Sequence, residues 1–172
     1  ILTMEDFDQY KPFFWDKGLE FKYRDKVIRV PKYASAGITS AMTMKTLNGF
    51  NLSKLEHNSS EMLHLYISSA RMAYADRFKF VADPEFADVP WNGMISDQYI
   101  QKRQKEIKDI APSEYNAGNP WIEEGRDPKF VLESSQPRPD SGTTHLGVID
   151  KDGNAVSITN TIMSGFGSGI IP

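Results

Sequence analysis

Two alternating runs of residues on either side of an Asp-Gly pair constrain the fold of this chain more than any other feature. The runs "THLGVID" (144–150) and "AVSITNTI" (155–162) alternate between apolar and polar residues, and Asp152-Gly153 lies in the connection "DKDGN". Asp-Gly between two such runs is a strong signal for a tight turn between antiparallel strands. A calcium loop is an alternative, but Gly153 comes too early for it and no glutamate closes the loop. The pattern therefore predicts a β-hairpin.

The residues before position 111 show the patterns of a helix-rich region. Capping residues, helical spacing of apolar residues and strand-like alternation predict its elements. The expected elements are a short helix over 3–10, a hairpin over 19–31, and helices over 36–50, 58–83 and 96–110. Together with the hairpin after residue 143, these elements predict an α+β fold.

The longest of these helices is expected to begin at Asn58 and to stop before Pro84. Its apolar residues fall at spacings of three and four, so they share one face of the helix. That face is formed by Leu63, Ile67, Ala70 and Tyr74. We expect it to be the side that packs into the protein.

Residues 111–142 lack any regular pattern. Prolines interrupt this segment at positions 112, 120, 128, 137 and 139, with Gly, Ser and Asn between them. Such a composition is typical of an extended, flexible linker. We therefore divide the chain into a helix-rich part (1–110), a linker (111–142) and a final hairpin part (143–172), and we expect the whole to be a piece of a longer protein.

The composition excludes several classes of function. The chain has no cysteine, so thiolate metal sites, disulfides and a cysteine nucleophile are excluded, and its three histidines are too scattered to suggest a metal cluster. The net charge is −3 without a basic block, which argues against nucleic acid as a partner. No apolar run is long enough to span a membrane. We expect no cofactor and no metal.

Thr143 has two interpretations. It can simply begin a strand, because threonine favours strands. It can also be a nucleophile, if the peptide bond between Gly142 and Thr143 is cleaved and the freed α-amine serves as the base that a threonine hydroxyl needs. The α-amine has a pKa near 8 in model compounds, which suits this role. Gly142 hinders attack on its carbonyl least and tolerates a strained backbone.

Other polar residues have weaker claims to a catalytic role. Asp76 and Arg77 are expected to be structural, as a surface pair or as a buried pair that holds the loop after the long helix. His64 lies beside an apolar stripe, which favours a core or interface position. His145 follows the threonines, but residues 143 and 145 of a strand have diverging tips, which is poor geometry for proton transfer.

Two long stretches resemble the γ-glutamyltranspeptidase family. "TTHLGVIDKDGNAVSITNTIMSGFGSGI" (143–170) is similar to the start of the family's small subunit, and "LHLYISSARMAYADRFKFVADPEFADVP" (63–90) is similar to a helix and loop of its large subunit. "MEDFDQYK" and "VPKYASAGI" match weaker family stretches. The resemblance spans nearly all of the chain in the right order.

The resemblance implies an N-terminal-nucleophile hydrolase with a four-layer αββα sandwich, made as one chain and self-cleaved into two subunits. By motif position, it implies that Thr143 is the nucleophile and that Thr161 hydrogen-bonds the Thr143 hydroxyl and supports processing. The partners it implies are a small-molecule γ-glutamyl or other amide and the chain's own second subunit. The groups that bind the substrate carboxylate and the oxyanion would lie outside these residues.

Met163 departs from the family pattern. It stands where the family has an asparagine that helps to hold the charged end of the glutamyl donor. A thioether cannot donate a hydrogen bond and accepts one only weakly. Three hypotheses follow: a γ-glutamyltranspeptidase-like enzyme that transfers an acyl group to water or an amino acid, an acylase or peptidase with the same machinery and a non-glutamyl substrate, and a non-catalytic paralogue.

Overall fold

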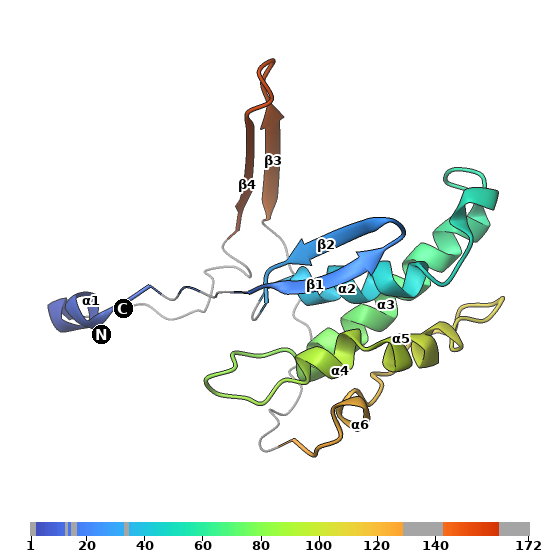
Figure 1. The fold of residues 1–172 in the computed structure, drawn as a ribbon, viewed down its shortest axis with the longest axis horizontal. Coiled ribbons are helices and arrows are strands. Elements are labelled where there is room, and N and C mark those ends of the chain that lie inside the picture. Colours follow the sequence, from blue (N-terminus) through green and yellow to red (C-terminus); the bar gives the residue numbers. More distant parts are fainter. Residues whose placement is uncertain (1–2, 13, 15–16, 33–34, 129–142, 162–172) are drawn as a thin grey trace. The chain divides into compact units, whose positions relative to one another are not determined.

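The computed structural model describes residues 3–12, 14, 17–32, 35–128 and 143–161, and its elements are drawn in Figure 1. The chain divides into two compact units, Trp15–Ser135 and Ile1–Phe14 with Gln136–Pro172. In chain order the elements are α1 (Met4–Gln9), β1 (Leu19–Tyr23), β2 (Lys26–Val30), α2 (Gly37–Leu47), a short 3-10 helix (Leu52–Lys54), α3 (Ser60–Phe80), α4 (Trp91–Ile95), α5 (Asp97–Gln104), α6 (Trp121–Glu124), β3 (Thr144–Ile149) and β4 (Ala155–Asn160). The predicted α+β class is confirmed. No described helix is both long and apolar enough to cross a membrane.

The unit Trp15–Ser135, called the helical unit below, has its core where α2 packs along α3. Figure 1 shows these two helices side by side, with the β1–β2 hairpin against α2. Ile38 and Met42 of α2 are buried, as their spacing predicts, and α4, α5 and the start of α6 complete the cluster. The buried members are Leu19, Ile38, Met42, Ala73, Phe80, Val89, Trp91, Met94, Tyr99, Ile100 and Trp121.

The long helix α3 packs with the opposite face from the one that its apolar spacing predicts. Leu63, Ile67 and Tyr74 are 41%, 51% and 49% exposed, whereas Ser68 and Ser69 are buried. The prediction of its inner face was therefore wrong. The buried face also carries the apolar residues Met72, Ala73 and Phe80, and Ser69 satisfies its hydroxyl by donating to the Leu65 carbonyl over 2.7 Å.

Two predicted helix boundaries shift. Ser59, not Asn58, caps α3, because its Oγ accepts the Met62 amide hydrogen. The helix expected over 96–110 ends at Gln104. The chain after it is held against α3 instead: His64 Nε2 lies 2.8 Å from the Lys108 carbonyl oxygen. This contact accounts for the position of His64 beside the apolar stripe.

Part of the predicted linker, within residues 111–128, contacts the helices, although most of its residues are exposed. Trp121 is the first residue of α6, and its side chain lies in the core. The backbone of Asn116 and Gly118 bonds to Arg103 and Asp76. Proline and glycine limit regular structure here to the short helix α6 but do not prevent tertiary contacts. Residues 129–142, the remainder of the predicted linker, lie outside the described residues.

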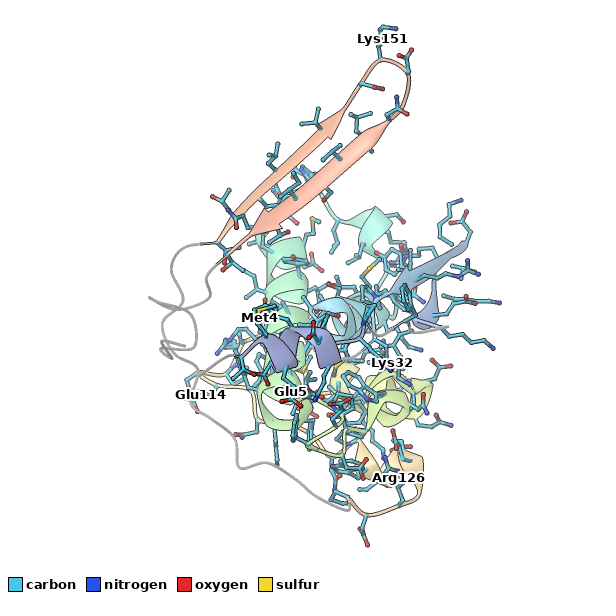
Figure 2. All side chains as sticks on the ribbon, turned by 90° about the vertical axis from the view of Figure 1, so that its left-hand side faces the viewer. Met4, Glu5, Lys32, Glu114, Arg126 and Lys151 are labelled. Atoms are coloured by element: carbon cyan, nitrogen blue, oxygen red, sulfur yellow. The ribbon has the colours of Figure 1, made fainter. Side chains whose placement is uncertain are left out.

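The β3–β4 hairpin predicted from the alternating runs is confirmed. The strands are antiparallel, with Thr144 opposite Asn160 and Ile149 opposite Ala155. Gly153 has φ +83°, the left-handed conformation that glycine adopts without steric cost. Lys151 projects from the tip of this turn, as Figure 2 shows.

Candidate active site

The two threonine hydroxyls singled out in the sequence lie together at the open end of the β3–β4 hairpin. Thr143 immediately precedes β3 and Thr161 immediately follows β4. Thr143 Oγ1 donates a hydrogen bond to Thr161 Oγ1 over 2.8 Å. The register of the hairpin explains this contact, because the pair lies one step beyond Thr144 and Asn160. The structure thus joins two residues that are 18 positions apart.

The register is set at the other end of the hairpin by Asp150. Its carboxylate accepts the backbone N–H groups of Asp152 and Asn154 and the side-chain amide of Asn154, all within 2.9 Å. These bonds, led by the Asn154 side chain, lower the pKa of Asp150. The carboxylate oxygens therefore hold the turn, as the interpretation of "DKDGN" as a turn requires.

One face of the hairpin is polar and carries the threonine pair. Side chains alternate between the two faces of a strand, so Thr143, His145 and Gly147 share a face with Ser157, Thr159 and Thr161. His145 Nδ1 lies 2.8 Å from Thr159 Oγ1, and its Nε2 lies 3.5 Å from Ser157 Oγ. His145 thus contacts hydroxyls of β4 and leaves the Thr143 hydroxyl to Thr161.

Two of the predicted site residues, Gly142 and Met163, lie outside the described residues. Within 3–128 and 143–161, apart from the gaps stated above, no group of three or more potential metal-binding side chains comes together.

Asp76 and Arg77 are structural residues, but they do not pair with each other or hold the loop that follows α3. The two side chains leave α3 in different directions. Arg77 donates to the Ser35 carbonyl over 2.7 Å, which ties the end of α3 to the start of α2. Asp76 is fully buried and contacts α5 and the segment after it.

The partner of Asp76 is Arg103 of α5. Arg103 is 3% exposed, and its Nε lies 3.5 Å from Asp76 Oδ2. The other carboxylate oxygen accepts the Gly118 amide hydrogen over 2.8 Å. Arg103 also donates to the Asn116 carbonyl over 2.9 Å and to Glu106 Oε2 over 2.7 Å. This cluster therefore fastens α3, α5 and residues 116–118 to one another.

The close fit of this cluster perturbs its acids. Burial raises the pKa of Asp76, and the Arg103 guanidinium opposes that rise. Burial also raises the pKa of Tyr99, with the Asp76 charge as a further cause. Gly118 passes directly over the Tyr99 hydroxyl, since a Cβ at position 118 would lie 2.3 Å from it. Asp76, Tyr99 and Arg103 are buried and the Asp76 carboxylate is paired with the Arg103 guanidinium, an arrangement that suits a structural role.

A family model described as gamma-glutamyltranspeptidase matches residues 1–172. The chain belongs to the γ-glutamyltranspeptidase family. Its similarity to a curated relative, the "Glutathione hydrolase proenzyme" of Bacillus subtilis subsp. natto, amounts to 36% identity over 148 residues, which is 85% of this chain and 25% of the relative.

Solved structures of two kinds resemble the chain. One is the γ-glutamyltranspeptidase of Helicobacter pylori, with a TM-score of 0.62 and 28% identity over 66% of this chain and 33% of that one. The other is a cephalosporin acylase from Bacillus halodurans, with a TM-score of 0.68 and 26% identity over 99% of this chain and 27% of that one. The chain thus spans about a quarter of the length of the curated relative and a quarter to a third of these structures.

The sequence interpretation missed the contact between His145 and Thr159. Counting outward from a two-residue Asp152-Gly153 turn would place His145 opposite Asn160, whereas the three-residue connection 151–153 of the structure places it opposite Thr159. It also missed the pairing of Asp76 with Arg103, because no local sequence pattern indicates which distant residues will pair.

Proposed function

We propose that the full-length protein is a self-processing threonine amidohydrolase or acyltransferase. The observation that carries this proposal is the hydroxyl pair of Thr143 and Thr161 at the open end of the β3–β4 hairpin, in a chain of the γ-glutamyltranspeptidase family. A threonine hydroxyl needs an adjacent base to act as a nucleophile. The α-amine freed by cleavage after Gly142 supplies it.

Processing and turnover use the same oxygen. In processing, Thr143 Oγ1 attacks the Gly142 carbonyl, and the acyl group shifts from nitrogen to oxygen while the hydroxyl proton passes to the nitrogen, which frees the Thr143 α-amine. Water then hydrolyses the ester, which releases the Gly142 carboxylate and restores the Thr143 hydroxyl. In turnover, that amine takes the Thr143 hydroxyl proton while Oγ1 attacks the substrate amide. The proton then goes to the leaving amine, and water or an amino acid removes the acyl group from Thr143.

The proposal is tested on full-length protein by two measurements. N-terminal sequencing of the shorter fragment is expected to begin Thr-Thr-His. The purified enzyme is expected to release amine from an amide substrate and to form a covalent acyl adduct on residue 143, detected by mass spectrometry. An intact chain that is nevertheless active, or an adduct at another residue, contradicts the proposal.

Thr161→Val is expected to slow both processing and turnover by about one to two orders of magnitude, the effect of losing one positioned hydrogen bond. The valine keeps the shape of the side chain and removes the oxygen that accepts from Thr143. Cleavage rates from timed gels and kcat of the mature enzyme measure the effect.

Two variants control this test. Thr161→Ser retains the hydroxyl and is expected to retain most of the rate. Thr144→Val makes the same change on the opposite face of the hairpin and is expected to have little effect. Equal rates for Thr161→Val and wild type would remove Thr161 from the mechanism.

A second candidate function, an acylase for a non-glutamyl amide, is favoured by Met163. The resemblance places a family asparagine at this position, and the chain also resembles a cephalosporin acylase. Losing one hydrogen bond to a charged group costs about 1.5–3 kcal/mol, or about one to two decades in kcat/KM. An apolar acyl group would instead gain from a flexible methionine side chain.

Met163→Asn is therefore expected to raise kcat/KM for a γ-glutamyl amide relative to an apolar acyl amide by about tenfold or more. The measurement compares both substrates in wild-type and variant full-length enzyme. Met163→Leu serves as the matched control, because it changes the shape without adding an amide. If wild type already prefers the γ-glutamyl amide and Met163→Asn changes nothing, then Met163 does not set the donor preference.

A further inference from the structure

The polar face of the β3–β4 hairpin holds a second pair of contacting side chains beside the threonine pair. His145 and Thr159 stand directly opposite each other, with Nδ1 and Oγ1 2.8 Å apart. Thr143 and Thr161 are the next pair on the same face, at the open end of the hairpin. Strand ends fray unless side-chain contacts hold them. The position of the Thr143 hydroxyl therefore depends on what fixes the last pairs of the ladder.

We propose that His145 and Thr159 form a cross-strand clamp that positions the nucleophile pair. This inference rests on the proposed function of Thr143. His145 acts as a positioning residue through Thr159, because its contacts among the described residues are to Thr159 and Ser157 and not to the Thr143 hydroxyl. Its contact keeps β3 and β4 in register one step inside the site, so that the hydroxyls of Thr143 and Thr161 meet at 2.8 Å.

The two ring nitrogens of His145 contact hydroxyl oxygens at different distances, and this difference identifies which contact forms the clamp. Nδ1 is 2.8 Å from Thr159 Oγ1, a normal hydrogen-bond distance, whereas Nε2 is 3.5 Å from Ser157 Oγ, at the limit of one. The clamp is therefore assigned to Nδ1 and Thr159. Ser157, opposite Gly147, lies on the same face but is not part of the clamp.

Substitution with asparagine and glutamine separates the two contacts. The amide introduced by H145N carries its polar atoms at about the distance of Nδ1 from the backbone, whereas the amide introduced by H145Q carries them at about the distance of Nε2. H145N is thus expected to keep the clamp and H145Q to lose it. H145F keeps an aromatic ring and removes both nitrogens.

The test measures the processing rate of full-length protein, and kcat and KM of the mature enzyme. H145F, H145Q and Thr159→Val are each expected to lower the processing rate and kcat by about three- to tenfold, the size of one cross-strand hydrogen bond. KM is expected to change less than about twofold, because the clamp orients the nucleophile and not the substrate. H145N and Thr159→Ser are expected to recover most of the loss, and Ser157→Ala is expected to behave like wild type.

A double variant decides whether the two residues act together. If the clamp exists, H145F combined with Thr159→Val is no slower than the slower single variant, because both remove the same contact. Multiplicative losses would overturn the inference, as would rescue by H145Q but not by H145N. Unchanged rates in H145F and Thr159→Val would overturn it as well.

A readout without catalysis keeps the inference separate from the proposed function. In the Thr143→Ala precursor, Thr159→Val is expected to speed amide hydrogen exchange at the open end of the hairpin more than at the Asp150 turn. Uniform or absent acceleration counts against the clamp. If Thr143→Ala itself leaves processing intact, the proposed nucleophile is wrong, and the exchange result still reports on His145 and Thr159.

Discussion

Full-length protein that carries Thr143→Ala is expected to remain a single chain, while wild type separates into two. The substitution removes the oxygen to which the Gly142 acyl group would shift, so the peptide bond has no internal nucleophile. Removing a catalytic nucleophile typically costs far more than removing a positioning group, and we expect cleavage to slow by more than about a thousandfold. Denaturing gels over a time course, with mass spectrometry of the intact protein, measure the result.

Two substitutions make this test specific to the Thr143 hydroxyl. Thr143→Ser keeps an oxygen and is expected to process, although more slowly, because serine lacks the methyl group that restricts χ1 in threonine. Thr144→Ala alters the adjacent residue on the other face of the hairpin and is expected to process normally. A Thr143→Ala protein that still yields a fragment starting at residue 143 would show that cleavage is not autocatalytic at this hydroxyl.

The second large effect is expected in the helical unit, from Arg103→Met. This change leaves the fully buried Asp76 carboxylate without its cation and frees the Asn116 carbonyl. Removing one partner of a buried ion pair costs about 3–5 kcal/mol at neutral pH. The free energy of local opening, measured by hydrogen exchange across α3 and α5 of the full-length protein, is expected to fall by this amount.

The loss of stability caused by Arg103→Met is expected to depend on pH. Burial raises the pKa of Asp76 in the folded protein, and Arg103 opposes that rise, so the variant raises it further. A carboxyl group whose pKa is higher in the folded than in the unfolded protein stabilises the fold while it is protonated. This contribution is complete below the unfolded pKa and is lost as the pH rises through the folded pKa. The loss of stability is therefore largest at neutral pH and shrinks as the solution becomes acidic enough to protonate Asp76.

Two comparisons isolate the buried pair. Replacing both residues, as Asp76→Leu with Arg103→Met, is expected to recover part of the loss, because neither charge is then left buried alone. Arg29→Met removes an arginine whose partner, Glu20, is also at the surface, and it is expected to change little. An Arg103→Met protein as stable as wild type at neutral pH would mean that Asp76 does not depend on this cation.

The hairpin was predictable from local sequence, and the two threonines of the candidate site from the resemblance to the family. Asp152-Gly153 specifies a turn, and alternation groups the side chains of each strand face. A two-residue turn at these positions would shift the pairing by one residue, and it is the three-residue connection 151–153 of the structure that brings Thr143 opposite Thr161. Turn chemistry and strand alternation are short-range effects, so they do not require knowledge of the rest of the fold.

The orientation of α3 and the pairing of Arg103 were not accessible in this way. Helical spacing correctly groups Leu63 with Ile67 and Tyr74, but the face of α3 that is buried carries both the polar Ser68 and Ser69 and the apolar Met72, Ala73 and Phe80. Arg103 meets a carboxylate 27 positions earlier in the chain. Periodicity determines which residues share a face, whereas contacts between distant segments arise only when the helices pack together, because they depend on side-chain volume and buried charge in three dimensions.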